Sequence, residues 1–249
     1  MAVLTIAGHR IDTQGQLSRI VVPSFEAAGL FHGFGLRGGL RPENWPAAAG
    51  MPTARLVTTT QIHSDRLVVV SNGSPMEPAD GLITDRANHL LGVFTADCLP
   101  VLLAEPTRGV VAAVHAGWRG LAQRILEKAV AMMTARWSVP VRGVTAALGP
   151  CIGACCFEVG DQVLMPLRQQ MADEEGVILP HPDGQPSSGK AMVDLQAWAT
   201  RQLGHAGVPA EQIFTVPLCT RCHPALFSSY RRDGRRKQEM FSGILRMTA

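Results

Sequence analysis

The sequence predicts an α+β protein, a mixed α/β sandwich in which groups of strands are interrupted by single helices. Its composition is globular, because 46% of the 249 residues are hydrophobic and 17% are charged. Short β-rich segments recur along the chain, and several are apolar throughout, which indicates strands covered on both faces. Helical patterns lie between these strands too irregularly for strict βαβ alternation. We expect one domain over residues 1–249.

The strand predictions rest on short runs of β-branched and other apolar residues. In chain order these runs are Arg55–Thr59, Leu67–Ser71, Leu90–Thr95, Val101–Ala104, Val110–His115, Val141–Leu148 and Ile213–Val216. Two segments rich in Gly and Pro, Arg37–Pro52 and Leu179–Gly189, lack such runs. We expect both to be surface loops.

The clearest helical pattern covers Leu121–Trp137. Its apolar residues recur at three- and four-residue steps and predict one buried stripe: Leu121, Ile125, Ala129, Met132, Met133 and Trp137. Two weaker patterns predict helices over Gly160–Met171 and Asp194–Ala206. In the second, Asp194 is a suitable N-cap and Gly207 a suitable stop.

Charge and hydropathy argue against a nucleic-acid-binding protein and against a transmembrane protein. The net charge is only +3, and the one dense basic stretch comprises Arg231, Arg232, Arg235, Arg236 and Lys237, which is too local for a nucleic-acid footprint. No apolar run approaches the roughly 18 residues of a spanning helix. Met1–Asp12 lacks the basic region and cleavage pattern of a secretory signal. We therefore expect a cytoplasmic protein that binds neither nucleic acid nor membrane.

Polar groups that suit a reactive site follow several apolar strands. Asp97 and Cys98 come after one strand, and His115 ends the next, immediately before a helix. The 17 residues from Cys98 to His115 allow a strand, a turn and a return strand that bring the two together. His63 follows an earlier strand. Two histidines and a cysteine suit Zn²⁺ with an open fourth position, although spacing alone equally allows a buried thiol and two hydrogen-bonded histidines.

Seven motifs follow one another in the chain: HGFGLRGG (32–39), TQIHS (60–64), ADGLITD (79–85), TADCLPVLL (95–103), AVHAGWRG (113–120), LGPCIGACCFEVG (148–160) and SYRRDG (229–234). In this order they resemble the bacterial YfiH/YlmD family, which is also labelled laccase-like multicopper polyphenol oxidase and purine nucleoside phosphorylase. The resemblance implies two packed mixed sheets flanked by helices, with His63, Cys98 and His115 as metal ligands, normally for zinc.

The same resemblance implies an enzyme of purine nucleosides. It would carry out phosphorolysis of adenosine, inosine, guanosine and methylthioadenosine, with adenosine deamination in the same site. Related members are tied to the editing of peptidoglycan precursors. Two segments depart from the family pattern: Leu40–Met51 is apolar and Pro-rich, and Arg235-Arg236-Lys237 replaces the usual Thr-Gly-Arg. Both departures bear on substrate preference and on how the pocket closes.

A chemical sketch assigns roles to these residues. A zinc ion would lower the pKa of water from about 15.7 to near 7, which suits hydrolytic attack on C6 of adenosine. Asp97 is a candidate for proton transfer or for orienting a ligand, and equally for capping the next turn. Arg37 and Arg119 are candidates for binding phosphate, because the planar guanidinium donates two hydrogen bonds side by side. The start of the long predicted helix, near Arg119, would also offer backbone amides. Either arginine could instead form a surface ion pair.

Other functions remain open from the sequence. A conventional multicopper oxidase needs on the order of ten histidines, whereas this chain has eight and no His-x-His pair. Cu²⁺ could still occupy the N/S site and oxidise phenols, which would make the protein a copper-dependent, laccase-like polyphenol oxidase. Cys98 could act as a nucleophile with His115 as its base, in a hydrolase that edits cell-wall precursors. A binding protein that senses a nucleotide or associates with the cell-wall machinery is a third alternative. We expect a nucleoside and phosphate as ligands, and a monomer or weak homo-oligomer.

The remaining cysteines are expected to be buried or partly exposed thiols. They are Cys151, Cys155, Cys156, Cys219 and Cys222. Two alternatives stay open for them. Cys219–His223 matches the C-x-x-C-H pattern of covalent haem attachment, and four of the cysteines could form a structural zinc site, although 63 residues separate Cys156 from Cys219.

Overall fold

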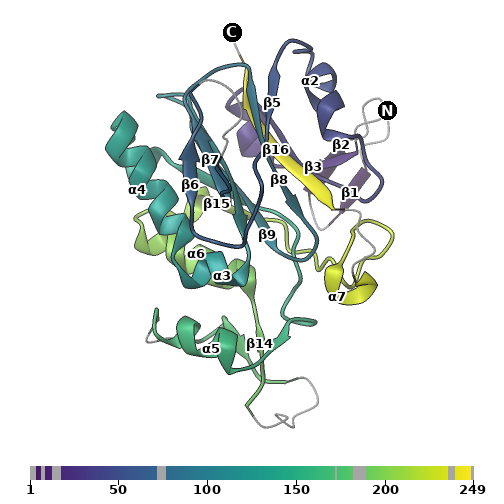
Figure 1. The fold of residues 1–249 in the computed structure, drawn as a ribbon, viewed down its shortest axis with the longest axis vertical. Helices are drawn as coiled ribbons and strands as arrows, with labels where there is room; N and C mark the ends of the chain where they lie inside the picture. Colours follow the sequence, from purple (N-terminus) through teal and green to yellow (C-terminus); the bar gives the residue numbers. More distant parts are fainter. Residues whose placement is uncertain are drawn as a thin grey trace.

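Two mixed β-sheets pack face to face, and helices cover the outer faces (Figure 1). The computed structural model describes residues 4–6, 9–12, 18–71, 77–171, 173–181, 189–234 and 239–247. In the order in which they pair, the strands of the first sheet are β1 (Leu4–Ile6), β2 (His9–Asp12), β3 (Arg19–Val21), β4 (Leu30–Gly35), β16 (Met240–Arg246), β8 (His89–Thr95) and β5 (Arg55–Val57). Neighbouring strands are antiparallel except for β5 and β8.

The second sheet has six strands and contains two parallel pairs, β6 with β7 and β11 with β15. In pairing order they are β15 (Ile213–Thr215), β11 (Thr145–Leu148), β9 (Leu99–Glu105), β10 (Val110–Ala116), β7 (Gly81–Thr84) and β6 (Leu67–Val69). A small third sheet contains β12 (Glu158–Val159), β14 (Ala191–Val193) and β13 (Ile178–Leu179). The expected pair of packed mixed sheets is therefore confirmed.

Helices lie on both sides of the two sheets. They are α1 (Pro23–Ala27), α2 (Trp45–Ala48), α3 (Trp118–Ala122), α4 (Ile125–Trp137), α5 (Asp161–Arg168), α6 (Leu195–His205) and α7 (Tyr230–Asp233), with short 3₁₀ turns at Pro42–Asn44, Val141–Gly143 and Ala210–Gln212. In Figure 1, α3, α4 and α6 lie beside the second sheet, and α2 lies near β5 of the first. None of the helices in the described ranges has the length and apolar content needed to cross a bilayer.

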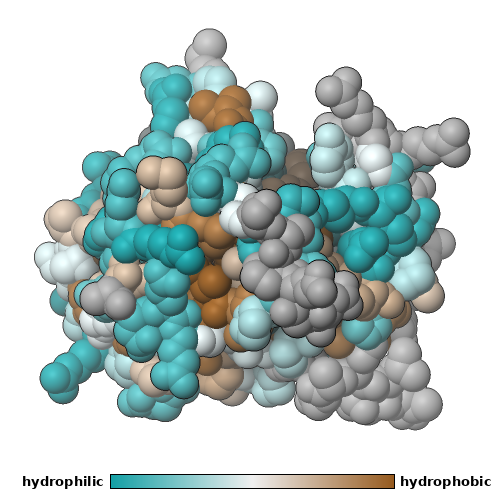
Figure 2. Space-filling view, turned by 90° about the horizontal axis from the view of Figure 1, so that it is seen from below, coloured by the Kyte–Doolittle hydropathy of each residue, from teal (hydrophilic) through white to brown (hydrophobic). Residues whose placement is uncertain are grey.

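The second sheet is the central layer of the protein. In β9, Val101 and Leu103 pack in the cluster that includes α4 and α6, while Leu102 and Ala104 pack against the first sheet. This alternation confirms that the uninterrupted apolar strands are covered on both faces. Viewed from below, hydrophilic side chains cover much of the coloured surface, and one group of strongly apolar atoms is visible near the middle of that face (Figure 2).

The predicted helix over Leu121–Trp137 is wrong in one respect, because the chain forms two helices with a break between them. Arg124 has a positive φ of 61° and separates α3 from α4. The side-chain amide of Gln202 donates to the carbonyl of Leu121 at 2.5 Å, and that of Gln170 donates to Ala122 at 2.6 Å. These glutamines therefore satisfy carbonyls that a continuous helix would bond internally.

Other boundaries also shift. The strand predicted from Val141 begins only at Thr145, after a 3₁₀ turn, and the expected loop at Arg37–Pro52 contains both a 3₁₀ turn and α2. Most of the predicted loop at Leu179–Gly189 lies outside the described residues, as do Arg235-Arg236-Lys237. The predicted cap of α6 is confirmed, because Asp194 Oδ1 accepts hydrogen bonds from the amides of Gln196 and Ala197.

A buried histidine in β4 makes the stability of the fold dependent on pH. His32 is fully buried, its Nε2 accepts the amide of Val22 at 2.8 Å, and its Nδ1 lies 3.2 Å from the carbonyl of Leu30. The ring is therefore neutral, with its hydrogen on Nδ1. Burial lowers the pKa of His32 from 6.5 to about 4.

We predict that acidification destabilises the protein through His32. The unfolded state binds the proton more tightly, so this contribution is complete above pH 6.5 and is lost progressively as the pH falls to about 4, a change of about 3 kcal/mol. Chemical denaturation of His32→Gln at several pH values should show a flatter pH dependence in this range. The control His89→Gln, at a half-buried histidine of β8, should keep the wild-type slope. A parallel slope in His32→Gln would contradict the assignment.

Candidate functional site

Three side chains from separate segments converge where β9 begins and β10 ends in the second sheet. One donor atom from each of His63, Cys98 and His115 lies within 4.8 Å of the other two. Antiparallel pairing explains the approach of two of them, because His115 near the end of β10 lies opposite Pro100, close to Cys98 at the start of β9. His63 arrives from the loop between β5 and β6, and its ring meets that of His115 edge to face, with centroids 4.8 Å apart.

A buried carboxylate positions both histidines. Asp80 is fully buried, and its Oδ1 lies 2.8 Å from His115 Nδ1 and accepts the amide of His63 at 2.9 Å. Its Oδ2 accepts the amide and the hydroxyl of Ser64 at 2.6 and 2.7 Å. With Nδ1 bound to Asp80, His115 has Nε2 left as its metal-ligating atom. The same bonds hold His63 at its unusual positive φ of 58°.

Asp80 is the functional residue that the sequence analysis missed. Burial would raise the pKa of its carboxyl group, but the hydrogen bonds from His115 and Ser64 outweigh this effect and lower the pKa to about 2. The carboxylate is therefore ionised at neutral pH. The available signal was its place in the motif ADGLITD, one residue before the buried strand β7.

The electrostatics of the site favour a thiolate. Burial would raise the pKa of Cys98, yet hydrogen bonds with His115 and His63 lower it to about 6. Burial also opposes the charge on His115, but its contacts with Asp80 and Cys98 raise the pKa of the imidazole to about 9. In the absence of a metal, Cys98 and His115 therefore form a thiolate–imidazolium pair at neutral pH.

Close packing explains one glycine of the motif AVHAGWRG. A Cβ atom on Gly117 would lie 3.0 Å from Cys98 Sγ and 3.7 Å from Cδ2 of His63. Any larger residue would crowd the sulfur of Cys98 and would contact the ring of His63. The glycine therefore lets the chain turn from β10 into α3 directly beside the site.

The three donors lie in a cleft of about 680 Å³ that has both apolar and cationic walls. Phe94, Trp118 and Phe157 supply aromatic surface, and Arg119 and Arg231 supply positive charge. This volume falls within the range of cavities that enclose small organic ligands. Aromatic faces suit a flat heterocycle, whereas guanidinium groups suit a phosphate.

Of the two arginines expected to bind phosphate, the structure brings one to the cleft. Arg119 is exposed in the five-residue helix α3, and its guanidinium lies 4.3 Å from the ring centroid of Trp118. Arg37 is not among the cleft-lining residues. Its Nη1 donates to the carbonyl of Pro224 and lies 3.8 Å from Asp233, which does line the cleft. Arg231 is a cleft arginine to which the sequence analysis gave no role.

Asp97 lines the cleft beside Cys98 and binds the C-terminal segment. Its Oδ1 accepts the hydroxyl of Thr220 at 2.6 Å. Its Oδ2 accepts the hydroxyl of Ser229 at 3.0 Å and the amide of Arg231 at 2.7 Å. The carboxylate thus joins the β8–β9 turn to the first turn of α7.

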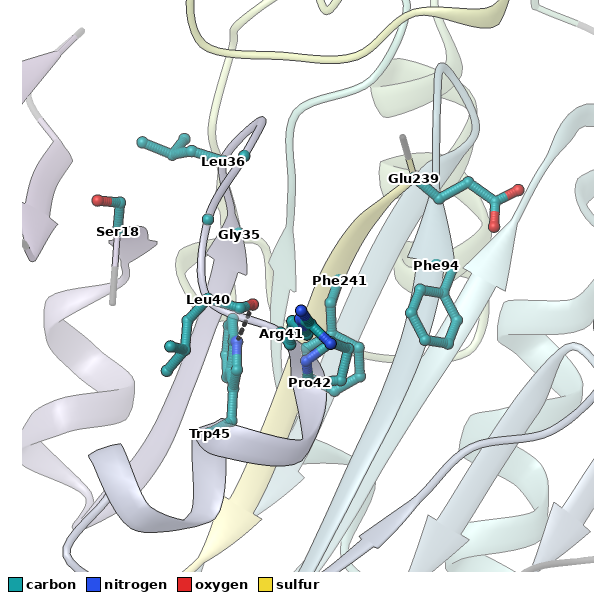
Figure 3. A pocket seen from close by; sticks show the side chains of 12 residues that line it. Ser18, Gly35, Leu36, Leu40, Arg41, Pro42, Trp45, Phe94, Glu239 and Phe241 are labelled. Atoms are coloured by element: carbon teal, nitrogen blue, oxygen red, sulfur yellow. Dashed lines mark hydrogen bonds between the residues drawn. The ribbon is translucent and has the colours of Figure 1, made fainter. Parts of the chain in front are cut away.

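A smaller cavity of about 210 Å³ adjoins the cleft and shares Phe94 and Glu239 with it (Figure 3). Its wall includes Leu40 and Trp45, from the segment that departs from the family pattern. The indole of Trp45 donates to the carbonyl of Leu40 at 3.3 Å and packs against Phe241, with ring centroids 4.8 Å apart. This apolar segment is therefore a structural part of the cavity next to the site.

Comparison with known proteins agrees with this architecture. The family model described as multi-copper polyphenol oxidoreductase laccase matches residues 42–246. The chain belongs to the YfiH/YlmD family. Two solved structures share this fold. YfiH from Bacillus licheniformis superposes on this chain with a TM-score of 0.84 at 26% sequence identity, and YlmD from Geobacillus stearothermophilus with a TM-score of 0.83 at 29% identity. The matches cover 96% and 95% of this chain, and 99% and 98% of those chains.

Named relatives in the family are enzymes of nucleosides. Adenosine deaminase RL5, from an unknown prokaryotic organism, is 36% identical over 207 residues, covering 79% of this chain and 77% of the relative. Purine nucleoside phosphorylase YlmD from Geobacillus stearothermophilus is 36% identical over 192 residues, with 73% and 69% covered.

Removing the charge of Asp80 should weaken metal binding at this YfiH/YlmD-family site. We predict that Asp80→Asn lowers the zinc affinity of the site about 10- to 100-fold, because His115 loses the carboxylate that orients it. Competition with a chromogenic chelator measures the change in a folded variant. Asp85→Asn, which removes a carboxylate just beyond the other end of β7, should leave the affinity unchanged. Equal affinities in the two variants would refute the role of Asp80.

Proposed function

We propose that this protein is a zinc-dependent purine nucleoside enzyme. It would catalyse phosphorolysis of adenosine, inosine, guanosine and methylthioadenosine, and would deaminate adenosine in the same site. The observation that carries this proposal is the convergence of His63, Cys98 and His115 in a cleft that also presents Arg119 and Arg231. The names of the relatives, an adenosine deaminase and a purine nucleoside phosphorylase, add support.

The three donors fit a catalytic zinc site. One thiolate and two imidazoles form a borderline-soft set, and three protein ligands leave one position for water or substrate. When bound there, zinc supplies Lewis acidity that activates water near neutral pH. Cu²⁺ also suits these ligands, but among the described residues no second cluster containing histidine accompanies this one. That arrangement favours a single ion over a multicopper centre.

The protein's own residues position the reactants in this proposal. The aromatic rings of Phe94, Trp118 and Phe157 offer surfaces for the purine base. Asp97, already bonded to Thr220, Ser229 and Arg231, would act mainly by holding α7 against the cleft.

Phosphate would bind at the cationic wall. Arg119 and Arg231 are the candidate partners, because both guanidinium groups belong to residues that line the cleft. The side chain of Arg231 is restrained by a hydrogen bond to the carbonyl of Glu158 at 3.3 Å. Arg37 lies outside the cleft and would contribute indirectly, because its ion pair with Asp233 would help to position that cleft-lining residue.

Turnover of nucleosides tests the proposal directly. Chromatography of adenosine, inosine and methylthioadenosine reactions, with and without phosphate, should show phosphate-dependent release of free base by the zinc-loaded protein. Cys98→Ala should lose this activity and the deamination of adenosine together, because both need the metal. Cys151→Ala, at a buried thiol outside the three donors, is the matched control and should remain active. Folded, zinc-loaded wild-type protein that turns over no nucleoside would refute the proposal.

The low pKa of Cys98 favours one second candidate, a Cys–His hydrolase acting on a cell-wall precursor. In that enzyme the Cys98 thiolate would attack an acyl carbon such as that of an amide, and His115 would protonate the departing amine as its bond to carbon breaks. Water, deprotonated by His115, would then hydrolyse the thioester and release the acid. Iodoacetamide separates the two functions. If Cys98 is a zinc ligand, it should be protected from alkylation until the metal is removed. If Cys98 is a free nucleophile, it should be alkylated without loss of bound metal.

Phosphate binding gives a separate prediction. Arg119→Ala should raise the KM for phosphate about 10- to 100-fold, the cost of about 1.5–3 kcal/mol expected for losing a charged hydrogen bond. Deamination of adenosine, which uses no phosphate, should change little. Steady-state kinetics at saturating nucleoside measure both. Arg142→Ala, in the 3₁₀ turn before β11, serves as the control. A loss of deamination equal to the loss of phosphorolysis would contradict this role.

A further inference from the structure

Four cysteines gather behind the cleft, in a cluster separate from the His63 site. The Sγ atoms of Cys155, Cys156, Cys219 and Cys222 all lie within 4.8 Å of one another. Cys222 Sγ lies 3.4 Å from that of Cys156 and 3.6 Å from that of Cys155. All six cysteines of the chain are free thiols. The fold therefore brings together two pairs that are more than 60 residues apart in the sequence.

The spacing of these sulfur atoms matches a tetrahedral metal site. A zinc–sulfur bond is about 2.3 Å long, so four sulfurs at the corners of a tetrahedron lie about 3.8 Å apart. The distances from Cys222 Sγ to those of Cys156 and Cys155, 3.4 and 3.6 Å, are close to this value. A disulfide would need one pair to approach to about 2.05 Å, whereas Cys222 lies almost equally far from two partners.

Donors around the cluster would stabilise deprotonated sulfur. The amide of Gly153 donates to Cys219 Sγ at 3.3 Å, and the guanidinium of Arg221 donates to Cys156 Sγ at 3.5 Å. Gly153 also leaves the space that this approach requires, because a Cβ there would lie 3.2 Å from Cys219 Cβ. One cation and one amide thus offset part of the negative charge that four thiolates around a divalent ion would carry.

We propose that Cys155, Cys156, Cys219 and Cys222 bind a second zinc ion with a structural role. Each thiol gives up its proton to solvent as the ion binds, and four protein ligands leave no position for substrate. Four thiolates are also a soft set that favours zinc over calcium or magnesium. The site is independent of the nucleoside chemistry proposed above.

The position of the cluster suggests what this ion would do. One pair of cysteines belongs to the segment that carries Ile152 and Phe157 into the cleft, and the other precedes the segment of Ser229 and Arg231, which forms another part of its wall. The backbone joins these segments by a hydrogen bond of 2.9 Å from the amide of Thr220 to the carbonyl of Cys151. The ion would cross-link the two walls next to this contact.

Metal content of the full chain tests the proposal. Protein purified with zinc and a non-thiol reductant, then dialysed against a weak chelator, should retain two zinc ions per chain by mass spectrometry. Cys98→Ala and Cys222→Ser should each retain one, and the double variant none. Cys151→Ala, next to the cluster but outside it, should retain two. Cobalt replacement gives a second readout, since thiolate-to-cobalt absorption should persist in Cys98→Ala and weaken strongly in Cys222→Ser.

Several results would overturn the second site. These are no zinc retained in Cys98→Ala, equal zinc contents in Cys222→Ser and the wild type, or a disulfide among the four cysteines in unreduced protein measured by intact mass. Cys155→Ser provides a second exposed position, should Cys222→Ser fail to fold by circular dichroism. Nucleoside turnover does not enter these measurements, so the second site and the proposed function can fail separately.

Discussion

The ionised carboxylate of Asp80 is the contact on which the candidate metal centre depends. It is fully buried, so its charge is stabilised by the hydrogen bonds that it accepts and by the nearby His115. Those bonds come from the backbone of residues 62–64, the hydroxyl of Ser64 and the ring of His115. The loop and the strand are thereby held together before any ion is bound. The arrangement is preorganised, since the ligands do not need to be collected from mobile parts of the chain.

Asp97 acts in a comparable way on the opposite wall of the cleft. Its φ of 89° places the carboxylate in a strained turn between β8 and β9, and the three hydrogen bonds to Thr220, Ser229 and Arg231 offset that strain. The C-terminal segment is consequently attached to the same turn that carries Cys98. Two buried carboxylates thus hold the segments that carry the three candidate donors and Arg231.

The apolar strands and the three donors could be predicted from the sequence because their signals are local or carried by motifs. Val101–Ala104 and Val110–His115 are largely apolar runs that contain valine, and the spacing from Cys98 to His115 suits a hairpin. The strands β4 and β16 escaped prediction because Gly, Ser and His interrupt them. In the sheet those small residues make room for neighbours: a Cβ on Gly35 of β4 would lie 2.5 Å from the carbonyl oxygen of Phe241 in β16. The roles of Asp80 and the break at Arg124 depend on side chains distant in sequence, which no local pattern reports.

The place of β16 in the first sheet has a consequence for how the protein forms during synthesis. This strand lies between β4 and β8, so those two strands have no direct pairing with each other. The ribosome completes β8 at Thr95 and reaches Met240, the first residue of β16, only 145 residues later. Until then the first sheet exists as two separate parts with unpaired edges, and one face of the second sheet lacks its full cover. We therefore expect nascent chains of this family member to expose hydrophobic strands until β16 is synthesised, because the final closure is a long-range event with a high contact order.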